Sequence, residues 1–341
     1  MSDTEESNRN DISLEKLAET SPSAITRFDK NGDIVYANSR AEKLLALEKS
    51  ETANRLNDNV EWQISDSAGE NYPREKLPFE IVKNTEEPIH DVKRGVKLPD
   101  GEKKFLSINA NPLFDNNEKF NGMISVIEDI TEHKKTKEEI ESQEYLLRRS
   151  FIELAETTSR VLGVRDPYTQ KHEQRVALFA RNVGRKLGLD EDRTLGLYLG
   201  GILHDIGKIA IPETILTKPG ELKEIEWSMI KSHPRVGCNQ ILQKTNFPWP
   251  IAEITLHHHE RLDGSGYPDG LEGDDLSLEV RIIGACDVVE AMSSRRPYRE
   301  ARTRSRTIEV IGNGKGDKFD PEVAEILVEM IENGNVEFGG K

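Results

Sequence analysis

The stretch LYLGGILHDIGK at residues 197–208 constrains the fold more narrowly than any other part of the sequence. Its leucines, isoleucine and glycines form an almost wholly apolar run, which is typical of a helix buried in a bundle. The run ends in an adjacent pair, His204 and Asp205. A buried carboxylate is costly unless a cation or several hydrogen bonds compensate its charge. The stretch therefore predicts a buried helix that carries a His-Asp pair to something that binds it.

Histidines are concentrated around this pair, because six of the eight lie between residues 172 and 259. Imidazoles and carboxylates without thiolates favour iron, manganese or zinc over a structural zinc knot. The sequence therefore predicts a metal site in which several segments meet. The further candidate ligands are His172, His233, His258, His259 and Asp287.

The composition of the 341-residue chain limits its partners and its compartment. Lys and Arg number 47 against 62 Asp and Glu, a net charge of −15, which disfavours binding to DNA or anionic membranes. No apolar run approaches the roughly 20 residues of a membrane span, and the acidic N-terminus does not resemble a signal peptide. Cys238 and Cys286 are the only cysteines, which fits a reducing cytoplasm. We expect a cytoplasmic protein without membrane insertion or DNA binding.

The region around this stretch, residues 161–335, reads as helices joined by loops rich in Pro and Gly. Residues 131–160 before it predict a charged helical linker. One apolar seam in the linker repeats every seven residues, and its companion positions are polar. The seam favours a parallel coiled coil and hence a homodimer, with a solvated single helix as the competing interpretation. The seam consists of Ile140, Leu147, Leu154 and Val161.

Residues 13–130 predict a small α+β domain, preceded by a disordered N-terminus at residues 1–12. AITRF (24–28) and IVYAN (34–38) flank Asn31-Gly32, a pair that favours a hairpin turn. Helical spacing follows at 40–47, and three strand-like runs separated by turn residues complete an antiparallel sheet with short helices.

Two segments of this domain, SPSAITRFDKNGDIVYANSRAEKLL (21–45) and INANPLFDNNEKFNGMISVIEDITEHK (108–134), resemble a PAS domain. The resemblance implies a sensory or dimerising module rather than a reaction. Asp129-Ile130-Thr131 is similar to the motif at which a PAS domain leads into an output helix. The residues do not identify a PAS ligand.

Four segments of the second domain resemble the HD-GYP class of the HD phosphohydrolases. They are RDPYTQKHEQRV (165–176), HDIGKIAIPETILTKPGEL (204–222), HHERLDGSGYPDGL (258–271) and DVVEAMSSRRPYREA (287–301). The resemblance implies an all-α, HD-type helical bundle. It also implies a metal-dependent phosphodiesterase that converts cyclic di-GMP to linear pGpG in bacterial second-messenger signalling.

The resemblance assigns roles to individual residues. His172, His204, Asp205 and Asp287 hold a first metal, and His233, His258 and His259 hold a second, with Asp205 bridging. Asp205 and Lys208 are the predicted catalytic residues. Lys208 follows the pair by one turn, where it can neutralise a phosphate oxygen or protonate the leaving group, with a helix C-terminal cation as the competing interpretation. Family members with three metals resemble each other in a Glu at the position of Tyr168. We therefore expect two divalent ions, iron or manganese, and the further conversion of pGpG to GMP stays open.

The resemblance also predicts the substrate contacts, which are Gly266, Tyr267, Pro268, Arg296 and Arg299. The glycine allows close backbone approach, the tyrosine offers a ring for a base, and the arginines suit phosphate. His257 lies outside the matched motif and is predicted to be a surface or supporting residue. Two alternatives stay open: hydrolysis of another cyclic dinucleotide such as cyclic GMP-AMP, and a catalytically silent signalling module.

Overall fold

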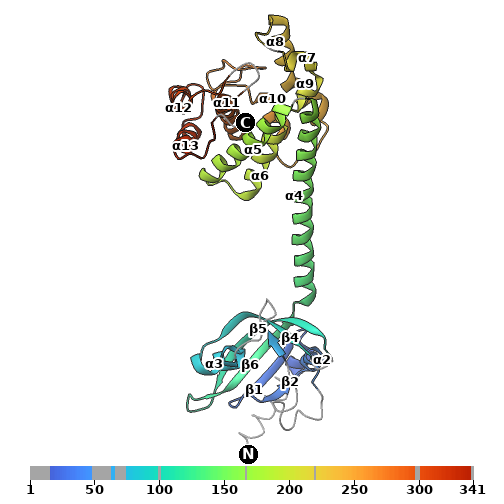
Figure 1. Cartoon of the computed structure of the whole chain (residues 1–341). Helices are drawn as coiled ribbons and strands as arrows, with labels where there is room; N and C mark the ends of the chain where they lie inside the picture. Colours follow the sequence, from blue (N-terminus) through green and yellow to red (C-terminus); the bar gives the residue numbers. More distant parts are fainter. Residues whose placement is uncertain are drawn as a thin grey trace, which may run out of the picture. The chain divides into compact units, whose positions relative to one another are not determined.

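The computed structural model divides the chain into two compact units, residues 1–145 and 146–341 (Figure 1). Each unit is treated by itself below. The structure describes residues 16–47, 63–65, 74–98, 101–165, 167–218, 220–295 and 300–338. The predicted disordered segment 1–12 lies outside these residues.

The first unit is built on a six-stranded antiparallel sheet in the order β2-β1-β6-β5-β4-β3. Residues 16–20 are helical, and two short α-helices interrupt the strands. The α+β prediction is confirmed. The elements are β1 (Ala24–Asp29), β2 (Ile34–Ala37), α2 (Ser39–Leu45), β3 (Gln63–Ser65), η1 (Arg74–Lys76), α3 (Pro78–Thr85), β4 (Ile89–Lys97), β5 (Lys103–Phe114) and β6 (Phe120–Asp129).

The predicted hairpin forms between β1 and β2, and Gly32 carries the positive φ of its turn. Asn31, the other residue of the predicted turn pair, donates its backbone and side-chain N–H groups to the Asp29 carboxylate. On β5, Leu106 and Ala110 are buried, and Ile108 between them is partly buried. Helices α2 and α3 cover this face, so the core of the unit lies on one side of the sheet.

Helix α4 (Thr131–Arg165) confirms a helical linker and extends beyond the expected end at residue 160. At its start, Asp129 accepts from the Thr131 N–H, and the Thr131 hydroxyl accepts from Phe105 of β5. Toward its end, Ala155 and Leu162 are buried in the core of the second unit. The last turns of α4 therefore belong to the helical unit.

All regular secondary structure in the described residues of the second unit is helical, apart from two isolated bridges. The all-α prediction is confirmed. Its elements are α5 (Pro167–Lys186), α6 (Glu191–Leu203), η2 (Ile206–Ala210), α7 (Glu213–Leu216), α8 (Glu224–Ile230), α9 (His233–Val236), η3 (Gly237–Leu242), α10 (Ile251–His257), η4 (Gly273–Asp275), α11 (Leu278–Ser293), α12 (Arg304–Asn313) and α13 (Pro321–Glu332).

Helices α5, α6 and α11 form the centre of this unit. The apolar stripe of α5 packs against α11, and the small-residue helix α6 packs against both α5 and α4. Gly201 of α6 makes the α5 contact close, because a Cβ there would lie 2.5 Å from the Ala177 Cα. None of the described helices combines the length and apolarity that crossing a bilayer requires.

Candidate metal centre

The histidines and aspartates singled out in the sequence meet inside the helical unit. They form two groups whose donor atoms each lie within 4.8 Å of one another, and which could each hold a metal ion. Every member except the half-buried His259 is buried. The first group is His172, His204 and Asp287, and the second is Asp205, His233, His258 and His259.

Asp205 stands between the two groups and turns one carboxylate oxygen toward each. Its Oδ2 lies 3.6 Å from Nε2 of His172 and 3.5 Å from Nε2 of His204. Its Oδ1 lies 3.1 Å from Nε2 of His233 and 3.8 Å from Nε2 of His258. This division of the two oxygens suits a carboxylate that bridges two sites.

Asp287 also touches members of both groups. Its Oδ1 lies 3.2 Å from Nε2 of His172, and its Oδ2 lies 3.8 Å from Nδ1 of His259. The sequence assigned Asp287 to one metal only. The tertiary structure adds the second contact because α11 passes both α5 and the end of α10.

The tautomers of three imidazoles are set by backbone carbonyls. Nδ1 of His204 contacts the Gly201 carbonyl, and Nδ1 of His233 and of His258 contact the carbonyls of Ile230 and Thr255. Each carbonyl can only accept, so Nδ1 donates and Nε2 is left with its lone pair. Within the described residues, Nε2 of His204 is buried without a hydrogen-bond partner.

Burial controls the protonation of these imidazoles. It lowers the pKa of His204 and, together with neighbouring imidazoles, lowers the pKa of His258 well below its ordinary value. Burial likewise lowers the pKa of His259 to about 3. For His172, burial is outweighed by hydrogen bonds to Asp287 and Glu290, and its pKa rises to about 9. Three imidazoles are therefore neutral donors at neutral pH, and His172 carries an extra proton until something displaces it.

The two aspartates remain ionised despite their burial. Burial opposes ionisation of Asp205, but the charge of the adjacent Lys208 outweighs this penalty, and the pKa of Asp205 lies well below the ordinary value. For Asp287, the hydrogen bond from His172 and its charge outweigh the same penalty and lower the pKa. Two buried carboxylates among neutral imidazoles form an oxygen and nitrogen donor set that suits a divalent transition metal.

Two glycines bring these segments close enough to form the cluster. A Cβ on Gly207 would lie 1.9 Å from the His233 carbonyl oxygen, so only glycine allows η2 to approach α9. A Cβ on Gly266 would lie 2.3 Å from the Glu260 Cα, which shows how tightly the loop after α10 folds back. Glu260 holds that loop by accepting from the N–H groups of Asp269 and Gly270.

Other predicted residues lie at the edge of the cluster. Lys208 contacts Asp205 Oδ2 and is partly exposed. The Tyr267 ring stacks on His259 with centroids 4.6 Å apart, and Lys231 Nζ lies 5.4 Å from its centroid. One face of the predicted base-stacking ring is therefore occupied by a candidate ligand. His257 points elsewhere, its Nε2 lying 3.2 Å from Asp269.

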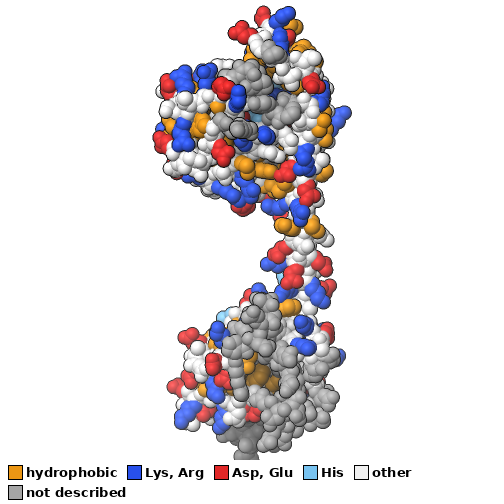
Figure 2. All heavy atoms as spheres, in the orientation of Figure 1, with side chains coloured by type: hydrophobic (Ala, Val, Ile, Leu, Met, Phe, Trp, Pro, Cys, Tyr) orange, Lys and Arg blue, Asp and Glu red, His pale blue; other side chains and the backbone are white. Residues whose placement is uncertain are grey.

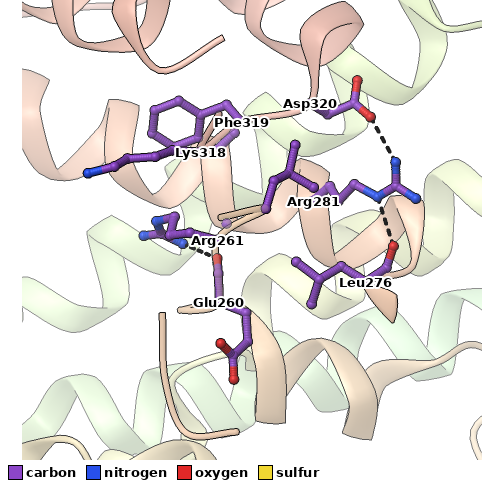
Figure 3. Close-up of a pocket in the computed structure, with 10 residues that line it drawn as sticks. Glu260, Arg261, Leu276, Arg281, Lys318, Phe319 and Asp320 are labelled. Carbon is purple, nitrogen blue, oxygen red and sulfur yellow. Dashed lines mark hydrogen bonds and ion pairs between the residues drawn. The ribbon is translucent and has the colours of Figure 1, made fainter. Parts of the chain in front are cut away.

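A small pocket lies behind the same loop (Figure 3). Arg261 donates from there to the carbonyls of His258 and Glu260, while the Glu260 carboxylate points away from it. Arg281 on the other side donates to the Leu276 carbonyl and to Asp320. Arg261 therefore braces the backbone that carries His258, and Arg281 ties the start of α11 to Asp320.

Three predicted positions are not described by the structure. Arg296 and Arg299 lie outside the described residues, and so does the side chain of Tyr168. Their assignments stay predictions.

Sequence reasoning missed the residues that surround the cluster. Glu290 is 1% exposed and contacts Nδ1 of His172. Its position three residues after Asp287 on α11 is the sequence signal that could have indicated a role at the cluster. Glu173 is also buried and contacts Ser159 of α4, and burial raises its pKa to about 8. A buried carboxyl next to His172 therefore touches the linker helix.

Family models match both units of the chain. Residues 156–323 match the model of the HD domain family, and residues 13–130 match that of the PAS fold. The chain is 41% identical over 171 residues to the cyclic di-GMP phosphodiesterase response regulator RpfG of Xanthomonas campestris pv. campestris, covering 50% of this chain and 45% of RpfG.

Two further relatives match to a similar extent. The cyclic di-GMP phosphodiesterase PA4108 of Pseudomonas aeruginosa is 36% identical over 170 residues, 50% of this chain and 41% of the relative. The 3'3'-cGAMP-specific phosphodiesterase 3 of Vibrio cholerae is 36% identical over 172 residues, 50% of this chain and 37% of the relative. The alignments span less than half the length of each relative.

Proposed function

Because this chain joins a PAS domain to an HD domain of the HD-GYP class, we propose that it is a PAS-regulated, metal-dependent phosphodiesterase that hydrolyses cyclic di-GMP to linear pGpG. The observation that carries the proposal is the position of Asp205, whose two oxygens each face a different group of histidines. A single ion pair or a structural hydrogen-bond network would not need this arrangement.

The donor set fits a pair of divalent metal ions. The unpartnered, buried Nε2 of His204 is the strongest sign, because burying such a lone pair without a partner is costly. His172, His204, Asp205 and Asp287 would hold one ion, and Asp205, His233, His258 and His259 the other. Such a pair polarises a phosphodiester and lowers the pKa of a bound water. We propose iron or manganese, with two ions per chain.

The chain's own residues supply the remaining requirements. Lys208 Nζ contacts Asp205 and is itself partly exposed, so its ammonium can neutralise a phosphate oxygen or give a proton to the leaving oxygen. Gly266 and Pro268 shape the loop beside His259, and Tyr267 lines it with an aromatic ring. Arg296 and Arg299 are proposed to contact the substrate's phosphates or guanines.

Cyclic di-GMP is the proposed substrate because RpfG and PA4108 are named for that activity. The relative from Vibrio cholerae is named for cyclic GMP-AMP, so that dinucleotide is the competing substrate in the experiment below. Both substrates carry two phosphodiester bonds in one ring, so the same cluster can serve either.

We also propose that the chain acts as a parallel homodimer through α4 and the PAS domain. The heptad residues Ile140, Leu147, Leu154 and Val161 are all more than half exposed, at 58%, 58%, 66% and 58%. Figure 2 shows hydrophobic side chains on the surface of α4 among charged ones. A stripe of this kind on a charged helix suits a second copy of the helix. Sedimentation equilibrium of the full chain and of a Leu147→Glu variant tests this, with a monomeric wild type contradicting it.

The decisive experiment is turnover of cyclic di-GMP by the purified full chain, reconstituted anaerobically with Fe(II) or Mn(II), with products separated by chromatography. We expect metal-dependent pGpG, and its loss in a His204→Ala/Asp205→Ala chain. GMP as the end product would contradict the proposal of only two metal ions per chain.

Two other outcomes would change the proposal. Faster turnover of cyclic GMP-AMP than of cyclic di-GMP would replace the substrate and keep the reaction. Bound metal without turnover of either dinucleotide would favour the silent signalling module.

A further inference from the structure

Glu290 lies directly behind His172 and is not among the residues that the proposed metal site uses. It sits near the end of α11 and is 1% exposed. Neither group of candidate ligands includes it. A buried carboxylate in contact with a candidate ligand needs a physical explanation, because its burial is costly.

Both oxygens of Glu290 are fully engaged. Its Oε2 contacts Nδ1 of His172. Its Oε1 accepts from Arg175 at 2.7 and 2.6 Å, and from the Ser294 hydroxyl at 2.6 Å. Arg175 follows His172 by three residues on α5, so one helix supplies both the imidazole and the cation that compensates the carboxylate. The carboxylate is therefore held rigidly on the side of His172 that faces away from the cluster.

This arrangement decides which nitrogen of His172 faces the cluster. Nδ1 is directed to Glu290, and Nε2 lies 3.2 Å from Asp287 Oδ1 and 3.6 Å from Asp205 Oδ2. A carboxylate can only accept, so Nδ1 keeps its proton and Nε2 becomes the nitrogen available to a metal. His204, His233 and His258 obtain the same orientation from backbone carbonyls, whereas His172 obtains it from a charged side chain.

We propose that Glu290, held by Arg175 and Ser294, is a positioning residue that fixes the tautomer and ring orientation of His172 for metal binding. The inference rests on the proposed metal site and adds a residue to it. Outer partners of metal-binding imidazoles raise ligand basicity, and their loss typically lowers metal affinity about 10–100-fold.

The test uses Zn(II), which is diamagnetic, and the full chain labelled with ¹⁵N-histidine. Long-range ¹H–¹⁵N spectra of the Zn(II)-loaded chain report which nitrogen of His172 carries a proton, with His172→Gln used for assignment. We expect a protonated Nδ1 and a metal-bound Nε2. Zn(II) titrations then compare wild type with Glu290→Gln and with Glu279→Gln, a matched change on α11 at an ion pair with Arg193.

We expect Zn(II) affinity about 10–100-fold weaker in Glu290→Gln, and unchanged in Glu279→Gln. A His172 bound through Nδ1, or equal affinity in wild type and Glu290→Gln, would overturn the positioning role and leave the metal site standing. Failure of the wild type to bind Zn(II) would instead overturn the metal site itself. The tautomer is read in the unaltered chain, so the test survives a Glu290→Gln chain that does not fold.

Discussion

Both units of the molecule bury polar side chains, but they satisfy them in opposite ways. In the PAS domain, Asn38 is fully buried and every hydrogen-bonding position of its amide is used. Its oxygen accepts from the N–H groups of Ile25 and Ala41, and its nitrogen donates to the carbonyls of Ala18 and Ser23. This amide is complete without any ligand.

In the HD domain, backbone carbonyls engage only one nitrogen each of His204, His233 and His258, and the other nitrogens face buried polar groups. Asp205 is surrounded by imidazole nitrogens, and His204 Nε2 makes no hydrogen bond among the described residues. Native interiors seldom leave such atoms unpaired, so the cluster is complete only when it holds something else. Burial of polar groups therefore indicates a binding site only when their mutual contacts leave donors or lone pairs unused.

The sharpest test of this contrast compares two adjacent histidines. His258→Ala removes a lone pair from the cluster, and we expect phosphodiesterase activity to fall by about 1,000-fold, since metal sites supply several kcal/mol of transition-state stabilisation. His257→Ala removes only a contact to Asp269 and should leave activity within about twofold. Equal losses, measured as kcat/KM on cyclic di-GMP, would contradict the assignment of His258.

A backbone test concerns the close approach of η2 to α9. Gly207→Ala places a methyl group against the His233 carbonyl, and we expect the free energy of unfolding to fall by about 3 kcal/mol. Gly312→Ala is the matched control, because nothing lies within 4 Å of its Cβ position on α12. That change should stabilise by about 0.5–1 kcal/mol. Urea unfolding curves measure both, and a Gly207→Ala chain as stable as wild type would show that the approach is not tight.

The complementary test is in the PAS domain. Asn38→Ala removes the N-cap of α2 and leaves the carbonyls of Ala18 and Ser23 without their donor, so we expect a loss of about 2 kcal/mol. Because this amide is purely structural, the metal content of the folded chain should not change. Reduced metal content, measured by elemental analysis at a temperature where the variant is folded, would break the contrast between the two units.

The smallest expected effect is a pH dependence of metal affinity. Since the pKa of His172 is raised to about 9, a metal must displace its proton at neutral pH, whereas His204, His258 and His259 are already neutral. Mn(II) affinity should therefore rise about tenfold per pH unit between pH 7 and 8.5. Calorimetric titrations measure this slope, and an affinity that does not change with pH would contradict a protonated His172.

The same shift has a consequence for the metal-free chain. The folded-state pKa of His172 lies above its ordinary value of 6.5, so its contribution to stability is complete below pH 6.5 and is lost as the pH rises through about 9. Thermal unfolding of the chelated protein across this range should show a falling midpoint.

Much of this molecule is predictable from local patterns. The hairpin around Gly32, the alternating strand β5 and the long helix α4 follow from spacing and turn residues. The cluster is also predictable, because charged and polar residues within apolar runs such as 197–208 are costly and therefore rarely accidental. The four motifs in their order along the chain indicate the HD-GYP class. A single His-Asp pair is not enough to identify that class.

Other features depend on which segments pack together. Asp287 contacts both groups of ligands, Glu290 orients His172, and Ser159 of the linker helix contacts Glu173. Residue types and their spacing along the chain identify groups that need partners, because the cost of burying a charge is a local property. Which partner each group receives depends on the close approach of helices distant in sequence, and only the folded packing of α4, α5 and α11 provides it.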